Sequence, residues 1–128
     1  MANDKKPVRI LCLDDEPAPP AALKSVLEPH GYEVVTTTSS MEALRIMQTT
    51  AVDLLIQDVY RPDMSGITLY GIMKADERLQ NIPVVICSGN GVRKFLDRYP
   101  KVEGALEKPF DVGHLLDVVR KALKSTEL

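Results

Sequence analysis

The stretch AVDLLIQDVYRPDMSG, residues 51–66, decides the fold that we predict for this chain. Its apolar run from Val52 to Ile56 ends on Gln57 and Asp58, and a turn-rich segment with proline, serine and glycine follows. A buried strand that ends on a carboxylate and breaks into a loop is how open α/β sheets present a reactive group. We therefore expect the chemistry of this protein to take place at Asp58.

Outward from this strand, the chain alternates short apolar runs with stretches of helical periodicity. The β-rich apolar runs are residues 8–13, 33–37, 52–57, 84–87 and 104–106. The helices that we predict between and after them begin near Pro19 or Pro20, after the capping-box residue Ser39, and cover residues 66–78, 92–99 and 111–124. Strands that are apolar throughout are buried on both faces, so this order predicts a doubly wound α/β fold with a parallel sheet between helices. We expect a disordered segment at residues 1–6 and a single domain over residues 7–126.

The composition is typical of one soluble domain. The chain has 128 residues, of which 45% are hydrophobic and 27% are charged, and its formal net charge is −2. It has no basic cluster, so we expect no direct binding to nucleic acid. No apolar stretch is long enough to span a bilayer, so we expect no membrane association. Cys12 and Cys87 fall inside predicted strands, where we interpret them as core residues of a cytoplasmic protein.

Polar side chains follow four of the predicted strands. Asp14 and Asp15 follow the first strand, Asp58 the third, Ser88 the fourth and Lys108 the fifth. Because all strands of a parallel sheet end at the same edge, we expect these residues to meet there. Converging carboxylates repel one another unless a cation lies among them, and oxygen ligands suit Mg²⁺. The set is coherent as a phosphoryl acceptor site in which a carboxylate acts as the nucleophile.

These residues, in this order, resemble the receiver domains of bacterial two-component response regulators over essentially the whole chain. The resemblance is carried by the acid pair Asp14-Asp15, by the motif DVYRPDMSG at residues 58–66, by Ser88 and by Lys108-Pro109-Phe110. It implies a (βα)5 flavodoxin-like, CheY-like fold whose strands lie in the order 2-1-3-4-5. It also implies a conformational switch that is phosphorylated on Asp58 by a sensor histidine kinase or a phosphotransfer protein.

The resemblance further implies a role for each matching position in the metal site. Asp15 resembles the acid that ligates Mg²⁺ directly, and Asp14 resembles the one that helps hold the ion, often through water. Asp58 and the backbone carbonyl of Tyr60 would complete the set, with Mn²⁺ as a substitute ion. Glu16 we interpret as a peripheral acid.

Ser88 and Lys108 resemble the hydroxyl and the lysine that hold the phosphoryl group, and the Lys108–Pro109 bond is expected to be cis. Tyr60 and Asn90, each two residues beyond a site residue, occupy positions that tune hydrolysis in the family. The family's switch aromatic is replaced by Ala105, so the usual aromatic relay is lost. We expect homodimerisation, if it occurs, to use the face formed by helix 92–99, strand 104–106 and helix 111–124.

Two alternatives compete with this interpretation. A hydrolase of the haloacid dehalogenase type also uses an aspartate nucleophile and Mg²⁺, but it requires a second acid two residues later, where this chain has Tyr60. A degenerate receiver that serves only as a protein-docking scaffold is compatible with Ala105 and is opposed by the intact acidic set. We therefore expect no enzyme, but a phosphoacceptor that catalyses its own phosphorylation and dephosphorylation.

Overall fold

The computed structural model of the chain describes residues 6–15 and 18–125, without the side chains of residues 18–21. Five parallel strands form one sheet: β1 (Arg9–Leu13), β2 (Glu33–Thr37), β3 (Leu54–Gln57), β4 (Val84–Ser88) and β5 (Gly104–Glu107). Their spatial order is β2-β1-β3-β4-β5, which confirms the predicted fold. Of the segment predicted to be disordered, only Lys6 lies within the described residues. Glu16 lies outside them.

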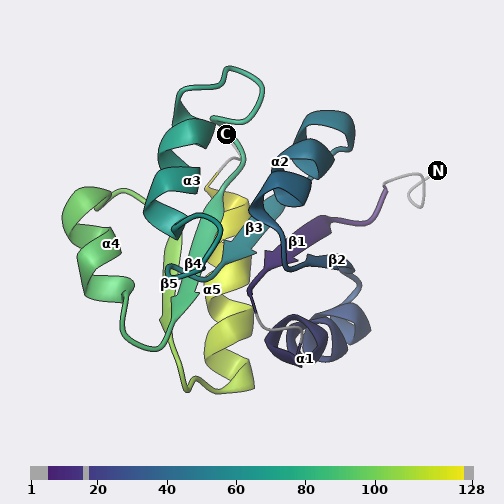
Figure 1. The fold of residues 1–128 in the computed structure, drawn as a ribbon. Coiled ribbons are helices and arrows are strands. Elements are labelled where there is room, and N and C mark those ends of the chain that lie inside the picture. The colour runs from purple at the N-terminus through teal and green to yellow at the C-terminus, as the bar shows by residue number, and fades with distance from the viewer. Residues whose placement is uncertain (1–5, 16–17, 126–128) are drawn as a thin grey trace.

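Within the described residues, five α-helices and one short 3₁₀ helix lie between and after the strands (Figure 1). They are α1 (Ala18–Leu27), η2 (Glu28–His30), α2 (Ser40–Thr49), α3 (Gly66–Lys74), α4 (Val92–Arg98) and α5 (Val112–Lys124). Gly31 follows η2 with a φ of 91°, a left-handed conformation that glycine adopts without steric cost. This glycine lets the chain turn from the end of η2 into β2.

Successive strand residues point to opposite faces of the sheet. Both faces are apolar, and a layer of helices covers each of them. Ile10, Cys12 and Ile56 lie in one hydrophobic cluster, with apolar residues of α1 and α5. Leu11 and Leu55 lie in the other cluster, with apolar residues of α2, α3 and α4. The sheet is therefore buried on both faces, which is why its strands read as continuous apolar runs.

Helix α2 begins with a capping box in which the Thr37 hydroxyl lies between the Ser39 N–H and the Glu42 carboxylate. The Ser39 hydroxyl accepts a hydrogen bond from the Glu42 N–H at 3.1 Å, as the sequence predicts. The Ser39 N–H donates to Thr37 Oγ1 at 3.1 Å, and that hydroxyl donates to the Glu42 carboxylate. Thr37 is the last residue of β2, so the cap ties the end of that strand to the start of α2.

Helix α3 is shorter than predicted and ends at Lys74 rather than near Arg78. The Asp76 carboxylate accepts the Arg78 N–H at 2.8 Å, and the Asp76 carbonyl accepts the N–H groups of Leu79 and Gln80. The aspartate thus begins a separate turn, because its side chain competes with the helix for backbone partners. Strand β2 has the predicted bounds, and the remaining elements lie within two residues of the predicted ranges.

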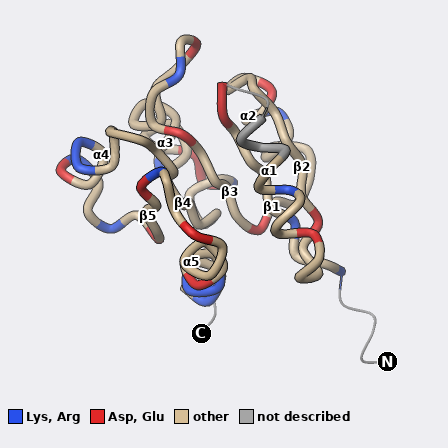
Figure 2. The backbone as a smooth tube through the Cα atoms, turned by 90° about the horizontal axis from the view of Figure 1, so that it is seen from below, with Lys and Arg blue, Asp and Glu red and all other residues tan. Residues whose placement is uncertain are grey.

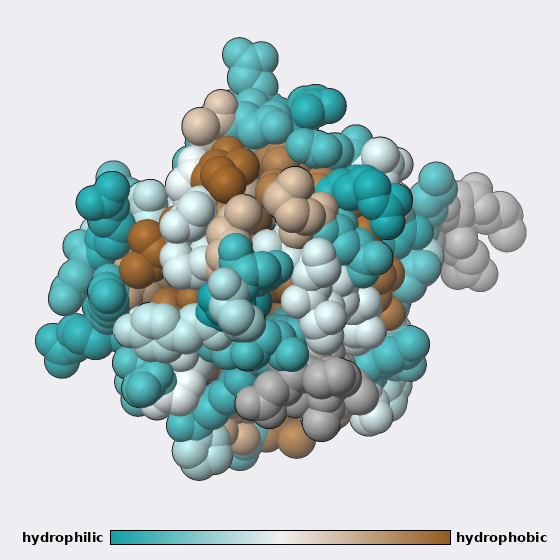
Figure 3. All heavy atoms as spheres, viewed as in Figure 1, coloured by the Kyte–Doolittle hydropathy of each residue, from teal (hydrophilic) through white to brown (hydrophobic). Residues whose placement is uncertain are grey.

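Charged and hydrophobic residues are dispersed over the molecule. Basic and acidic segments are interspersed along the chain in Figure 2. On the face shown in Figure 3, hydrophobic residues form small patches separated by polar ones. No helix within residues 6–15 and 18–125 is long and apolar enough to cross a membrane.

Candidate functional site

The carboxyl ends of β1 and β3 hold two acidic residues side by side. Leu13 and Gln57 are the last paired residues of these strands, and Asp14 and Asp58 follow them directly. The ladder continues one step further, because the Asp58 N–H donates to the Leu13 carbonyl at 3.1 Å. On the other side, the Asp14 N–H donates to the Thr37 carbonyl at 3.3 Å. Hydrogen bonds to β1 and to β2 therefore fix the backbone of both acids.

Asp14, Asp15 and Asp58 form one cluster. Each offers a carboxylate oxygen, and these oxygens lie within 4.8 Å of one another. Asp14 is buried and Asp15 is exposed. The pKa of Asp15 is raised, first by loss of solvent and then by the hydrogen bond and negative charge of Asp14, with Asp58 adding to the effect. The cluster thus has an unfavourable concentration of negative charge, which a cation would relieve.

Lys108 brings a positive charge to this cluster from the end of β5. Its Nζ lies 2.9 Å from Asp14 Oδ2. Burial lowers the pKa of Lys108, but the hydrogen bond and charge of Asp14 outweigh burial, so that the pKa is raised overall. The Lys108 N–H donates to the Ser88 carbonyl at 2.9 Å, and the Lys108–Pro109 peptide bond is cis.

Ser88 is the last residue of β4, one residue beyond the predicted end of that strand, because it pairs with Glu107 of β5. Its side chain is buried, and its hydroxyl oxygen accepts the Gly91 N–H at 3.0 Å. The hydroxyl hydrogen of Ser88 is not used in that bond. Asn90 and the side chain of Tyr60 are exposed beside this turn.

Ala105 lies in β5, opposite Ile86 of β4. It lines an open groove together with Val92 and Leu96 of α4 and His114 of α5. Glu107, the last residue of β5, also lines this groove. The structure therefore places Ala105 at a groove between α4 and α5.

A buried arginine, Arg61, contacts the loop after Asp58, and no periodic pattern in the sequence predicts its burial. The Arg61 side chain is 0% exposed. It donates to the Asp58 carbonyl, to Gln57 Oε1 at 3.1 Å and to Ser40 Oγ at 3.1 Å. Asp63, 3.9 Å from the guanidinium, accepts hydrogen bonds from the N–H and the hydroxyl of Ser40. These residues connect the loop after Asp58 to the start of α2.

Comparison with known proteins gives one consistent family. Residues 10–120 match the family described as response regulator receiver domain. The polar-differentiation response regulator DivK of Brucella ovis is 25% identical over 116 residues, which cover 89% of this chain and 94% of DivK.

Solved structures agree in fold. A response regulator receiver domain protein from Clostridium thermocellum has a TM-score of 0.82 and 28% identity, with 94% of this chain and 97% of that chain covered. The receiver domain of a sensor histidine kinase from Pseudomonas aeruginosa has a TM-score of 0.82, 19% identity, and coverage of 92% and 98%. In that structure a magnesium ion is coordinated in the active site cleft. The fold, the family match and the order of the site residues lead to one conclusion: this chain belongs to the response regulator receiver domains of two-component signalling.

Proposed function

We propose that this chain is a phosphorylation-dependent switch in which Asp58 accepts a phosphoryl group in a magnesium-dependent reaction. The observation that carries the proposal is the cluster of Asp14, Asp15 and Asp58 beside Lys108. Three carboxylates and one ammonium group at the end of a parallel sheet form a site for a cation and a phosphoryl group together. The domain that performs this function is proposed to cover residues 7–126.

The acidic cluster fits a magnesium ion. Mg²⁺ binds oxygens at about 2.1 Å, so opposite ligands of an octahedral site are about 4.2 Å apart. The three carboxylate oxygens, within 4.8 Å of one another, need to move only slightly to reach such a geometry. Asp14, Asp15 and Asp58, with the Tyr60 carbonyl, would hold Mg²⁺ or Mn²⁺. When bound, the ion supplies positive charge that neutralises the oxygens of an incoming phosphoryl group.

In the proposed reaction an oxygen of Asp58 attacks the phosphorus of a phosphohistidine on a sensor kinase or a phosphotransfer protein. The bond from phosphorus to the imidazole nitrogen breaks, and its electron pair remains on that nitrogen. Lys108 exchanges its bond with Asp14 for one with a phosphoryl oxygen. The Ser88 hydroxyl donates its unused hydrogen to a second phosphoryl oxygen while still accepting from Gly91.

The output of the switch is proposed to leave through the face formed by α4, β5 and α5. This face includes the groove at Ala105, and homodimerisation is proposed for the same face. Tyr60 and Asn90, exposed beside the site, are proposed to control access of water to the acyl phosphate. A cytoplasmic location is part of the proposal and is supported by the free, buried thiols of Cys12 and Cys87.

Incubation with acetyl phosphate and Mg²⁺ tests the proposal. Intact mass spectrometry should detect one added phosphoryl group in the wild type and none in Asp58→Asn. Asp53→Asn is the matched control, because Asp53 lies at the opposite end of β3, where it accepts the Arg9 N–H at 2.8 Å. A phosphoryl group that persists in Asp58→Asn, or its absence from the wild type, would overturn the proposal.

A further inference from the structure

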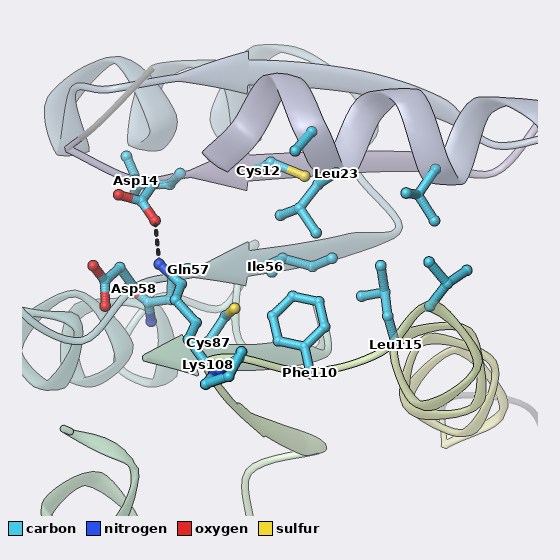
Figure 4. Close-up of a pocket in the computed structure, with 15 residues that line it drawn as sticks. Cys12, Asp14, Leu23, Ile56, Gln57, Asp58, Cys87, Lys108, Phe110 and Leu115 are labelled. Atoms are coloured by element: carbon cyan, nitrogen blue, oxygen red, sulfur yellow. Dashed lines mark hydrogen bonds and ion pairs between the residues drawn. The ribbon is translucent and has the colours of Figure 1, made fainter. Parts of the chain in front are cut away.

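A cavity of about 330 Å³ lies between α1, α5 and the sheet, and it extends to the acidic site (Figure 4). Its walls are apolar and come from distant parts of the chain: Cys12, Leu23, Ile56, Cys87, Phe110 and Leu115. In Figure 4 these side chains lie around one elongated space, with Asp14 and Asp58 at one end and Leu115 toward the other. Its volume is within the range of small-molecule sites, about 300–1,000 Å³.

Small side chains leave this space open. Two of the sheet residues that line it, Cys12 and Cys87, have small side chains, and Ala22 of α1 lines it as well. Both thiols are free and buried. They behave as small hydrophobic groups and contribute an apolar surface. A space with such walls favours the apolar part of a ligand over water.

The polar end of the cavity has an excess of negative charge. Asp14 and Asp58 line it, Asp15 is within 4.8 Å of both through its carboxylate, and Lys108 is the one cation among the lining residues described. That cation is already paired with Asp14. A ligand whose apolar body fills the cavity can therefore bring its head group to Asp58, where a positive charge is favoured and a negative charge is opposed.

From this arrangement we infer that the cavity binds a small amphiphilic cation, with an apolar body the size of one aromatic ring and a short chain, and an ammonium head at Asp58. The head and a divalent cation would use the same carboxylate oxygens. The ligand and Mg²⁺ would therefore exclude one another, and the ligand would slow any magnesium-dependent reaction of Asp58. Binding itself requires neither Mg²⁺ nor a phosphodonor, so it can be tested independently of the proposed function.

Three probes of the same shape separate the contribution of the head group from that of the body. Phenylbutylamine, phenylbutanol and phenylbutyrate are titrated into the metal-free wild type, followed by amide chemical shifts in NMR spectra. We expect the amine to bind at least tenfold more tightly than the acid, with the alcohol between them. Perturbed amides should include Cys12, Leu23 and Leu115. Excess Mg²⁺ should weaken the amine at least fivefold and leave the alcohol within twofold.

Two variants locate the binding site. Ala22→Phe fills the cavity from α1 and should weaken the amine at least tenfold, whereas Lys24→Phe, on an exposed position of the same helix, should not. Asp58→Asn should weaken the amine several-fold and leave the alcohol unchanged. The inference is overturned if no probe binds, if the acid binds as tightly as the amine, or if Ala22→Phe and Lys24→Phe bind equally.

Discussion

The guanidinium of Arg61 donates a hydrogen bond to the backbone carbonyl of Asp58, the proposed phosphoacceptor. The same side chain reaches Gln57 Oε1 and Ser40 Oγ, and its Nη2 atom is buried without a hydrogen-bond partner among the described residues. Burial lowers the pKa of Arg61, while the surrounding carboxylates, Asp63 first, favour its charge. The loop that presents Asp58 is therefore attached to α2 through a buried charge.

Removal of this guanidinium should destabilise the fold. Arg61→Ala leaves the buried acceptor of Gln57 without its donor and opens a cavity, at an expected cost of about 2–3 kcal/mol in the free energy of unfolding. Arg45→Ala is the control, because its exposed guanidinium lies 3.8 Å from Glu42 and such pairs contribute about 0.5 kcal/mol. Urea unfolding of both variants measures the difference. Equal losses would contradict a structural role for Arg61.

The Asp63 carboxylate should make stability depend on pH at the acidic end. Burial raises its pKa, but hydrogen bonds from Ser40 and the charge of Arg61 outweigh burial and lower the pKa overall. Its contribution is therefore present above the unfolded-state pKa of about 3.9 and is lost as the pH falls through the lower folded-state pKa.

We expect Asp63→Asn to be less stable than the wild type near neutral pH, and the difference to shrink as the pH falls below about 4. Thermal unfolding across this range measures it. A stability difference that is constant with pH would show that the charge of Asp63 does not cause it.

Gly66 should not tolerate a methyl group. A Cβ at this position would lie 2.8 Å from the Asp58 carbonyl oxygen and 3.0 Å from Val59 Cα, both backbone atoms. Gly66→Ala should therefore displace the loop that carries Asp58, at a cost of about 1–3 kcal/mol in the free energy of unfolding. At Gly89 a Cβ would meet nothing within 4 Å, so Gly89→Ala should unfold within about 0.5 kcal/mol of the wild type. Chemical denaturation compares the two variants, and a neutral Gly66→Ala would refute the steric argument.

Loss of the Lys108 ammonium should change magnesium affinity in the opposite direction from loss of an acid. Lys108→Met removes the cation that neutralises Asp14, so Mg²⁺ should bind several-fold more tightly while acyl phosphate formation falls. Lys121→Met, at an exposed position of α5, is the control and should change neither quantity. Calorimetric titration with Mg²⁺ and intact mass after acetyl phosphate treatment are the two measurements.

The ion pair between Lys108 and Asp14 should also make the stability of the fold depend on pH at alkaline pH. Because the pKa of Lys108 is raised, its stabilising contribution is complete below the unfolded-state value of about 10.4 and is lost as the pH rises through the higher folded-state pKa. The stability difference between the wild type and Lys108→Met should therefore decrease above about pH 10. A stability difference that does not change above about pH 10 would show that the ion pair is not the source of that difference.

Much of the fold and the candidate site follows from local features of the sequence. Continuous apolar runs predict strands buried on both faces, and the order of strands and helices predicts the doubly wound sheet. Asp58 is predicted as the reactive residue because its carboxylate directly follows the apolar run at residues 52–57 and precedes a turn. The end of α3 was predicted wrongly, because the turn that begins at Asp76 depends on a side-chain hydrogen bond that has no periodic signature.

The particular side-chain partners of residues that are far apart in the sequence could be decided only by the tertiary structure. Lys108 and Asp14 are 94 residues apart, and their ion pair exists because β5 and β1 end at the same edge of the sheet. Arg61 lies in a predicted turn, where an exposed side chain is expected. Its burial depends on the contact with Ser40 at the start of α2, which the tertiary structure provides. The cavity depends on how α1 and α5 pack over two small thiols. Local propensity determines the elements, whereas burial, ion pairing and empty space are properties of the surfaces that those elements bring together.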